Sequence, residues 1–282
     1  MAGKKVVIGL SGGVDSSVAA YLLKQKGYEV IGVTMQTWTP EDEEDTDPAA
    51  GGSPEVTKDA REVAQALGIP YYVVDFQKEF SQHVMDYFSR EYLAGRTPNP
   101  CVVCNRFVKW EALLAKARQL GAEYIATGHY AKIARLENGR YTLRACDSSA
   151  KDQTYALYNL TQEQLAHTQM PVGDYTKDEI RRIAAQIGLK VADKPDSQEI
   201  CFIPDHDYAK FIRKRNGVEI PEGNFVTADG TVLGKHRGII HYTIGQRKGL
   251  NLSMGHPVFV TEIRRKTNEV VIGESEDVFA PA

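Results

Sequence analysis

Strand-like and helix-like segments alternate along the first half of the chain. Short apolar runs rich in β-branched residues are typical of strands, and runs with apolar residues at helical spacing, each followed by glycine, are typical of helices. Strands are predicted at Lys4–Leu10, Glu29–Thr34, Ile69–Asp75 and Glu123–Thr127, and helices at Ser16–Lys26, Pro54–Leu67, Gln77–Ala94 and Arg106–Leu120. Because the strands are apolar throughout and helices separate them, this pattern predicts an α/β fold whose parallel sheet is covered on both faces.

The middle of the chain has a different pattern. Asn138-Gly139 separates short runs at Ala131–Arg135 and Arg140–Ala145 and predicts a β-hairpin. Two short helices are predicted at Thr161–Thr168 and Thr176–Ile187, because each begins at a threonine that can cap its first turn.

From about Pro204 the chain is rich in glycine and its apolar residues alternate, which is typical of β structure. We expect strands at Gly238–Gly245, Pro257–Arg264 and Glu269–Gly273. A chain of 282 residues is long enough for two domains. The sequence therefore predicts a Rossmann-like α/β domain over residues 1–203 and a small, mainly β domain over residues 204–282.

The composition is that of an ordinary globular protein, with 34 Lys and Arg residues, 37 Asp and Glu residues and a net charge of −3. These values exclude a disordered or fibrous chain, and no apolar run approaches the roughly 18–20 residues that span a bilayer. The N-terminus lacks the long apolar segment of a secretion signal, so we expect a cytoplasmic protein. Six acids lie in Glu41–Asp47, within residues 40–53, which we interpret as a flexible surface insertion.

The segment Ser11-Gly12-Gly13-Val14-Asp15-Ser16-Ser17 lies between the first predicted strand and the first predicted helix. Glycine allows the backbone to approach an anion closely, and the start of a helix presents free N–H groups and the positive end of the helix dipole. The serines add hydroxyl donors, and Asp15 could hold a Mg²⁺ ion that bridges phosphates. The spacing matches neither G-x-x-x-x-G-K-[ST] nor G-x-G-x-x-G, which disfavours a P-loop kinase and a dinucleotide-binding dehydrogenase. An ordinary capped turn is the alternative interpretation.

This segment resembles the pyrophosphate loop, or PP-loop, of the ATP pyrophosphatases. The resemblance implies a PP-loop type of α/β sheet and an enzyme that forms an adenylate and releases pyrophosphate. Met35 ends the second predicted strand, and Gly128 follows the fourth. Both therefore belong to the carboxyl edge of the sheet, where open α/β sheets bind their ligands.

The four cysteines are Cys101, Cys104, Cys146 and Cys201. In a reducing compartment, cysteines of a chain this long are more often catalytic, metal-binding or buried than disulfide-linked. Cys101 and Cys104 lie in a proline-rich loop that leads into a helix, and six cations against two acids occur from Arg90 to Arg118. Since positive charge and a helix N-terminus both lower the pKa of a thiol, we predict a reactive thiolate at Cys104 near a polyanion.

Other interpretations of the cysteines stay open. Cys101 and Cys104 could be an inert buried pair, and a single C-x-x-C is a poor zinc site. Cys146 has no polar cluster around it in the sequence and is interpreted as structural. Cys101, Cys104 and Cys201 could instead ligate a 4Fe–4S cluster with one open iron.

Six motifs occur here in the order in which they occur in the bacterial tRNA-specific 2-thiouridine synthases, or thiouridylases. They are SGGVDSS (11–17), NPCVVCNR (99–106), Gly128-His129-Tyr130, Lys151-Asp152-Gln153, SQEICFI (197–203) and YTIGQRKGL (242–250). Together they resemble this family over essentially the whole chain.

The resemblance implies a role for each group of residues. Cys104 aligns with the family's nucleophile and Cys201 with the cysteine that carries a persulfide. The implied ATP contacts are Gly9, Leu10, Ser11, Gly12, Gly13, Val14, Asp15, Ser16, Met35 and Gly128. The implied tRNA contacts are Asn99, Pro100 and Cys101 at the target base, with His129, Lys151, Asp152 and Gln153. No residue is assigned as a protein ligand of a metal.

The resemblance also implies a reaction and its partners. ATP, with Mg²⁺, would activate the C2 oxygen of the wobble uridine as an adenylate, and a persulfide would supply the sulfur, with release of AMP and pyrophosphate and formation of a Cys104–Cys201 disulfide. The implied substrates are the tRNAs for Lys, Glu and Gln. The implied sulfur source is a cysteine desulfurase or a sulfur-relay carrier protein.

The chain departs from the family pattern in two ways. Many relatives have aspartate, a proposed acid and base, where this chain has Cys101. Relatives also continue into a C-terminal β-barrel that grips tRNA, and we expect this barrel to be absent here.

The alternatives are therefore an iron–sulfur-dependent tRNA thiolase, another PP-loop ligase, and a non-catalytic module that binds tRNA or a sulfur carrier. The basic runs Arg213-Lys214-Arg215, Arg247-Lys248 and Arg264-Arg265-Lys266 are further candidate phosphate contacts.

Overall fold

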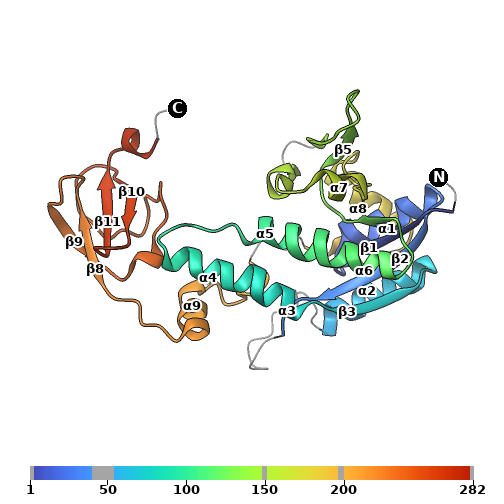
Figure 1. Cartoon of the computed structure of the whole chain (residues 1–282), viewed down its shortest axis with the longest axis horizontal. Coiled ribbons are helices and arrows are strands. Elements are labelled where there is room, and N and C mark those ends of the chain that lie inside the picture. Colours follow the sequence, from blue (N-terminus) through green and yellow to red (C-terminus); the bar gives the residue numbers. More distant parts are fainter. Residues whose placement is uncertain (1–2, 40–53, 148–150, 196–199, 280–282) are drawn as a thin grey trace. The chain divides into compact units, whose positions relative to one another are not determined.

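A computed structural model describes residues 3–39, 54–147, 151–195 and 200–279 (Figure 1). The insertion predicted to be flexible, residues 40–53, lies outside the described residues. The chain divides into two compact units, one of residues 1–84 and 100–205 and the other of residues 85–99 and 206–282. No helix in the described ranges is both long and apolar enough to cross a membrane.

The first unit contains a five-stranded sheet in the order β3-β2-β1-β4-β7. All of its neighbouring strands are parallel, which confirms the predicted parallel α/β sheet. The strands are β1 (Lys5–Gly9), β2 (Glu29–Gln36), β3 (Tyr71–Asp75), β4 (Tyr124–Ala126) and β7 (Thr168–Gln169). The two-residue strand β7 lies at one edge of the sheet and is too short for the sequence pattern to indicate it.

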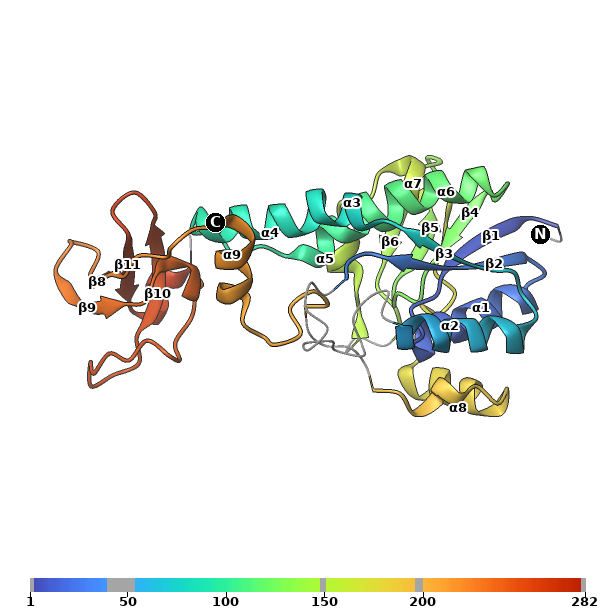
Figure 2. The same ribbon diagram turned by 90° about the horizontal axis from the view of Figure 1, so that it is seen from below.

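Helices cover both faces of this sheet. Figure 2 shows α1 (Val14–Gln25) and α2 (Pro54–Leu67) on one face and α6 (Leu113–Gln119) on the other. The predicted caps of two further helices are confirmed, since Thr161 and Thr176 each complete a capping box. Those helices are α7 (Gln162–Ala166) and α8 (Lys177–Gln186).

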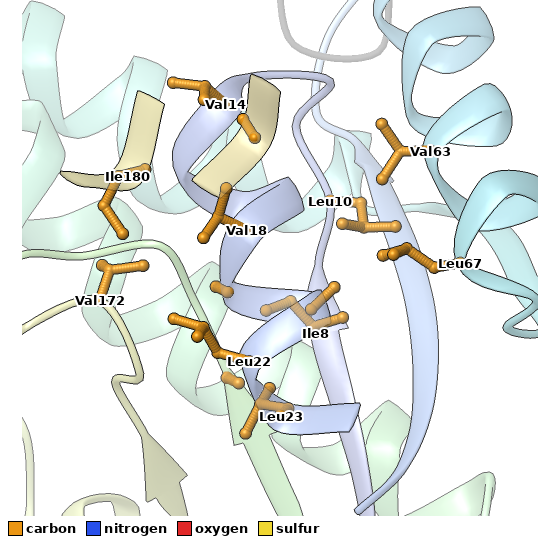
Figure 3. Packing of buried hydrophobic residues seen from close by; sticks show 14 of the residues in the cluster. Ile8, Leu10, Val14, Val18, Leu22, Leu23, Val63, Leu67, Val172 and Ile180 are labelled. Atoms are coloured by element: carbon orange, nitrogen blue, oxygen red, sulfur yellow. The ribbon is translucent and has the colours of Figure 1, made fainter. Parts of the chain in front are cut away.

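The core of the first unit fixes the place where β1 meets α1. Figure 3 shows Ile8 and Leu10 packed among apolar side chains of α1 and α2, with Ile180 of α8 in the same cluster. Val14 is also buried in this cluster. Fully burying one such side chain contributes roughly 1.5–3 kcal/mol. The residues on both sides of the connection are thus anchored, and Ser11, Gly12 and Gly13 span the gap between them.

Two long helical segments contain wider π-helical turns. The first consists of α3 (Gln77–Phe80), η2 (Ser81–Met85) and α4 (Asp86–Leu93) and confirms the predicted helix at these residues. The second consists of α5 (Pro100–Val103), η3 (Cys104–Ala112) and α6. Its predicted start at Arg106 was wrong, because Pro100 suits the first turn of a helix, where no N–H partner is needed.

Smaller elements complete the first unit. The predicted hairpin is confirmed as β5 (Lys132–Arg135) paired with β6 (Tyr141–Arg144). Short 3₁₀ helices follow, η5 at Thr154–Leu157 and η6 at Lys190–Asp193.

The second unit has a four-stranded sheet in the order β10-β11-β8-β9. Its strands are β8 (Gly223–Val226), β9 (Val232–His236), β10 (Phe259–Arg264) and β11 (Glu269–Gly273). The central pair β11 and β8 is parallel, and both outer pairs are antiparallel. The small β-rich part that the sequence predicts is therefore confirmed.

Helix α4 packs within the second unit on α9 (Tyr208–Asn216). Tyr92 stacks on Tyr208 with ring centroids 4.8 Å apart, and Arg215 binds the Asp86 carboxylate at 2.6 Å. These contacts join residues 85–99 to a much later part of the chain.

One prediction for this unit was wrong, and one helix was not predicted. Gly238–Gly245 contains a 3₁₀ helix, η7 (Ile239–His241), where a strand was expected; Gly238 precedes it with φ +114°, in the range that favours glycine. Helix α9 was not predicted because the whole segment after Pro204 was interpreted as β structure, although residues 207–216 contain no glycine. Asp207 accepts a hydrogen bond from the Lys210 N–H at its start, and Gly217 ends it in the left-handed conformation. A short helix, η8 (Ser275–Val278), follows β11.

Candidate active site

The connection from β1 to α1 is held together by its own serines. The Ser16 hydroxyl accepts a hydrogen bond from the Ser11 N–H and lies 3.2 Å from the Ser11 hydroxyl. The Ser17 hydroxyl donates to the Gly13 carbonyl at 2.7 Å. No side chain of the described residues caps α1 at Gly13, so N–H groups of its first turn lack a capping partner there. The start of α1 can therefore present donors to an anion.

Glycines allow other segments to approach this connection closely. A Cβ on Gly12, which has φ +66°, would lie 2.9 Å from the Val56 carbonyl oxygen. A Cβ on Gly128 would lie 2.7 Å from the Ser16 nitrogen. Both contacts are with backbone atoms, which cannot move away as a flexible side chain can. The predicted ligand residue Gly128 is thus brought against the connection that contains Ser16.

The remaining residues predicted to contact ATP differ in which of their atoms could reach a ligand. Met35 lies on β2 with its Cε 3.5 Å from where a Gly9 Cβ would be, so both belong to one small region. The side chains of Leu10 and Val14 are buried in the core, and only their backbone atoms could face a ligand. Ser11 is exposed.

Asp15 is bound by two residues that the sequence did not indicate. The Lys177 ammonium donates to both carboxylate oxygens at 2.8 Å, and the Tyr130 hydroxyl donates to one of them at 2.7 Å. Lys177 is the first residue of α8 and lies far along the chain from Asp15. No spacing signal links the two; the only signals were the Thr176 cap, which places Lys177 at the start of a helix, and Tyr130 in the Gly-His-Tyr motif.

The donor atoms at this site do not fit a protein-bound metal. Both Asp15 oxygens accept hydrogen bonds, so the carboxylate that could have held Mg²⁺ is occupied by Lys177. Among the described residues no group of three or more His, Cys, Asp or Glu side chains is arranged to hold a metal ion. This donor set supports neither a protein-bound Mg²⁺ nor the 4Fe–4S alternative.

His129 is half-buried, and two neighbours fix its ring. Its Nδ1 is 2.6 Å from the Thr127 hydroxyl, and its ring lies 5.5 Å from the Trp110 ring. Burial, with a smaller contribution from the Lys109 ammonium, holds the pKa of His129 well below the ordinary range for histidine. The imidazole is therefore neutral at physiological pH.

Two predicted motifs meet at Tyr130. Its N–H donates to the Gln153 side-chain oxygen at 2.9 Å, and the Gln153 N–H donates to the Tyr130 carbonyl at 3.0 Å. Gln153 therefore lies beside His129, as the two motifs would require if they bound one ligand.

The neighbours of Gln153 have different environments. The Asp152 carboxylate accepts from the N–H groups of Cys146 and Thr154 and from the Thr154 hydroxyl, and the Thr154 bond is the main cause of its lowered pKa. This carboxylate orders the turn around it. Lys151 is half-buried.

Three of the four cysteines form one group in the first unit. Cys104 and Cys101 both raise the pKa of Cys201, and Cys101 raises the pKa of Cys104, so the three sulfurs interact electrostatically. None of the three forms a disulfide with another described residue. Cys146 is buried and contributes its backbone N–H to Asp152, in keeping with the structural role predicted for it.

The prediction that Cys104 has a lowered pKa was wrong. The helix begins at Pro100, so Cys104 lies in the second turn, beyond the free N–H groups of the first. Burial raises the pKa of Cys104, and the Lys109 ammonium opposes this effect. Cys201 has an exposed residue surface, yet surrounding protein atoms remove water from its thiol, and this desolvation raises its pKa to about 12.

The segment predicted to meet the target base leads into α5. Asn99 immediately precedes Pro100, which is buried, and Cys101 is exposed. The next turn is fixed by Asn105, whose Nδ2 donates to the Ala156 carbonyl of η5 at 2.8 Å. The Asn105 Oδ1 is buried and has no hydrogen-bond partner among the described residues. The second cysteine of the C-x-x-C is therefore adjacent to a residue that anchors η5.

Two tyrosines on or next to η5 face solvent. Tyr155 is 71% exposed and Tyr158 is 64% exposed, and their ring centroids lie 6.1 Å apart. Exposed apolar side chains that lie next to one another are more typical of interaction sites than scattered ones. No sequence pattern indicated the pair, although both residues follow the Lys-Asp-Gln motif closely.

The basic clusters proposed as phosphate contacts are not uniform. Arg215 is bound to Asp86, and Arg264 to Glu262, so these two guanidinium groups are occupied. The other members, Arg213, Lys214, Arg247, Lys248, Arg265 and Lys266, are exposed.

Comparison with known families matches both parts of the chain. A family model described as "tRNA methyl transferase HUP domain" matches residues 4–205, and one described as "tRNA methyl transferase PRC-barrel domain" matches residues 209–274. The tRNA-specific 2-thiouridylase MnmA of Lachnoclostridium phytofermentans is 62% identical over 98% of this chain and 78% of its own length. The enzyme of the same name from Clostridium acetobutylicum is 59% identical with the same coverage.

Solved structures show more distant similarity. A 4-thiouridine synthetase in complex with RNA and ATP is 18% identical, with a TM-score of 0.46 over 76% of this chain and 50% of that one. The NMN synthetase of Francisella tularensis is 17% identical, with a TM-score of 0.43 over 77% and 78% of the two chains.

Proposed function

This chain belongs to the tRNA-specific 2-thiouridylase family, and from that membership we propose that it replaces the C2 oxygen of a uridine in tRNA with sulfur in an ATP-dependent reaction. One arrangement within the first unit carries the proposal beyond family membership. Gly128 packs on the β1–α1 connection, and the pKa of the next residue, His129, is lowered by burial and then by the Lys109 ammonium. The same Lys109 ammonium acts on both Cys104 and Cys201. A phosphate site and a thiol group are thus connected through neighbouring residues.

The β1–α1 connection supports the activation step. Uncapped N–H groups of α1, the helix dipole and the exposed Ser11 are suited to the phosphates of ATP. Attack of the uridine C2 oxygen on the α-phosphorus forms an adenylate and releases pyrophosphate. The step converts a poor leaving group into AMP. Because the donor atoms do not fit a protein-bound Mg²⁺, any Mg²⁺ would reach the site with ATP, and we assign it no step.

The grouped thiols support the sulfur-transfer step. In our proposal a persulfide on Cys201 attacks C2 with its terminal sulfur, and the C2–O bond breaks to release AMP. The Cys104 thiolate then attacks the inner sulfur of Cys201, which leaves the terminal sulfur on the uridine and forms a Cys104–Cys201 disulfide. A two-electron reductant must reduce this disulfide before the next turnover. Burial keeps both thiols protonated in the resting protein. The Lys109 ammonium lowers the pKa of both cysteines and therefore favours their thiolates.

Recognition of RNA is supported by the aromatic pair at η5. Unstacked bases of single-stranded RNA loops stack on exposed aromatic rings, and an anticodon loop can present its wobble uridine in this way. Tyr155 and Tyr158 offer such rings close to Gln153. We propose the wobble uridine as the target, the tRNAs for Lys, Glu and Gln as substrates, a cysteine desulfurase or sulfur-relay carrier as the sulfur source, and the cytoplasm as the location.

The experiment that tests this function is mass spectrometry of nucleosides from tRNA incubated with the protein, ATP, Mg²⁺ and a persulfide donor. We expect 2-thiouridine to form and pyrophosphate to be released in equal amounts. Cys104→Ser and Cys201→Ser should each abolish the product, whereas Cys146→Ser, at the buried thiol outside the group, should keep it. Full thiolation by either of the first two variants would falsify the two-cysteine scheme.

A further inference from the structure

The second unit contains a cavity of about 410 Å³ that no motif of the sequence predicted. It lies at the start of α9, and its polar lining consists of His206, Asp207, Tyr208, Arg213, Arg237 and His241. The lining comes from α9, from the residue after β9 and from η7, so three separate segments build it.

Two guanidinium groups of the cavity are available to a ligand. Neither Arg213 nor Arg237 has a side-chain hydrogen bond or an ion pair with any residue that the structure describes, and both are exposed. Arg215, two residues further along α9, differs because Asp86 holds it at 2.6 Å. Helix α9 thus has one guanidinium group in an ion pair, at Arg215, and one that can bind an anion, at Arg213.

Rings and one carboxylate form the rest of the lining. The Tyr208 and His241 ring centroids lie 6.4 Å apart, and the Tyr208 ring also stacks on the Tyr92 ring. Asp207 is the acid of the lining, and its carboxylate already accepts the Lys210 N–H at the start of α9. The two arginines therefore outnumber the one acid.

His241 responds to the same charges. Burial, followed by Arg237 and Arg213, lowers its pKa to about 4; Asp207 raises it and His236 lowers it slightly. The imidazole is neutral at physiological pH, so it can donate one hydrogen bond without adding a charge that repels the arginines. An anion placed between the arginines would favour its protonated form.

We propose that this cavity binds a phosphate group of the tRNA backbone through Arg213 and Arg237, with His241 as an additional donor. The proposal rests on the proposed function, which supplies tRNA as the polyanion. Arginine forks match the paired oxygens of a phosphodiester, and the open cavity suits a backbone that passes through it. Such a contact reads no base, so it would position tRNA independently of the target uridine.

The first test measures the affinity of the full-length protein for unmodified tRNA at several salt concentrations. Arg213→Gln and Arg237→Gln should each weaken binding about three- to tenfold and reduce the slope of log affinity against log salt by about 0.7–0.9. Lys210→Gln is the matched control, because it removes the same charge from the same helix outside the cavity lining. Equal losses for Lys210→Gln and Arg213→Gln would overturn the proposal, since they would indicate a general positive field.

The second test uses inorganic phosphate and the histidine signals of the protein in NMR. Phosphate should raise the pKa of His241 in the wild type and leave it unchanged in Arg213→Gln/Arg237→Gln. An unchanged wild-type His241 would overturn the assignment of the cavity as a phosphate site.

The two proposals fail in distinguishable ways. If the wild type makes 2-thiouridine and the arginine variants keep wild-type affinity and salt slope, the cavity proposal is wrong and the proposed function stands. If the wild type neither binds nor thiolates tRNA, the proposed function fails and the cavity proposal fails with it.

Discussion

Lys177 and Asp15 form a two-point ion pair across the start of α1, with both Asp15 carboxylate oxygens 2.8 Å from the Lys177 ammonium. The pair is mostly shielded from water, since the side chains of Lys177 and Asp15 are 12% and 29% exposed. It joins the first turn of α8 to the first turn of α1 and so fixes the orientation of the β1–α1 connection.

Asp15→Asn should lower the free energy of unfolding by about 1–3 kcal/mol, because it leaves a partly buried ammonium without its charge partner. Lys177→Met should have a similar effect, and the double variant should lose less than the sum of the two. Urea unfolding of the four proteins measures this coupling. The pair Lys190–Glu62, which is exposed, serves as the control and should show little coupling. Strictly additive losses for Asp15 and Lys177 would contradict the structural role of the pair.

Gly128→Ala should weaken ATP binding and stability together. The new methyl group would lie 2.7 Å from the Ser16 nitrogen and 2.8 Å from the Asp15 carbonyl carbon, so the β1–α1 connection must move. Overpacking of this kind typically destabilises by about 1–3 kcal/mol. Gly9→Ala adds the same methyl group at 3.5 Å from the Met35 Cε, an ordinary contact, and should destabilise far less. Equal melting temperatures for the two variants, measured by calorimetry, would show that Gly128 is not tightly packed.

Alkylation of Cys104 and Cys201 should be slow at neutral pH and accelerate about tenfold per pH unit up to pH 9, because only the thiolate reacts and both pKa values are raised. Iodoacetamide labelling followed by peptide mass spectrometry measures each site. The same shifts bear on stability. Since the folded pKa values exceed the unfolded value near 9, this stabilising contribution is complete below pH 9 and is lost as the pH rises toward 12. Rapid labelling of Cys104 at pH 7 would contradict the effect of its burial.

Tyr155→Ala and Tyr158→Ala should each weaken tRNA binding about tenfold, since stacking of one base on an aromatic ring contributes about 1–3 kcal/mol. The stability of the protein should hardly change, because both side chains are mostly exposed. Tyr72→Ala is the matched control, as Tyr72 is 47% exposed and belongs to β3 and to none of the proposed RNA-binding motifs. A binding assay at fixed salt measures all three. Comparable losses for Tyr72→Ala and Tyr155→Ala would argue against a stacking role for the pair.

The sheet and its helices could be predicted from the sequence because local patterns carry them. The β-branched strands and the glycines that end each helix are local signals, and so are the capping threonines of α7 and α8. The approach of Gly128 to Ser16 followed from a general rule for parallel sheets, whose carboxyl edges gather their loops.

Other features depend on the folded environment and had no local signal. The partner of Asp15 is contributed by α8, and no spacing in the sequence pairs the two. The pKa of Cys104 was predicted from charge and helix position, but burial decided its direction. The cavity beside Arg213 joins three segments, and the sequence pattern did not indicate even the helix that carries Arg213.

The division of the chain into units has a consequence for its synthesis on the ribosome. Helix α4 is made early, but its partner α9 emerges only after all of residues 100–205. Until then Phe88 and Tyr92 of α4 lack their ring contacts with Phe211 and Tyr208. A fragment of residues 206–282 alone would in turn lack Asp86 for Arg215. The second unit can therefore assemble only late in translation, after the first has been able to fold.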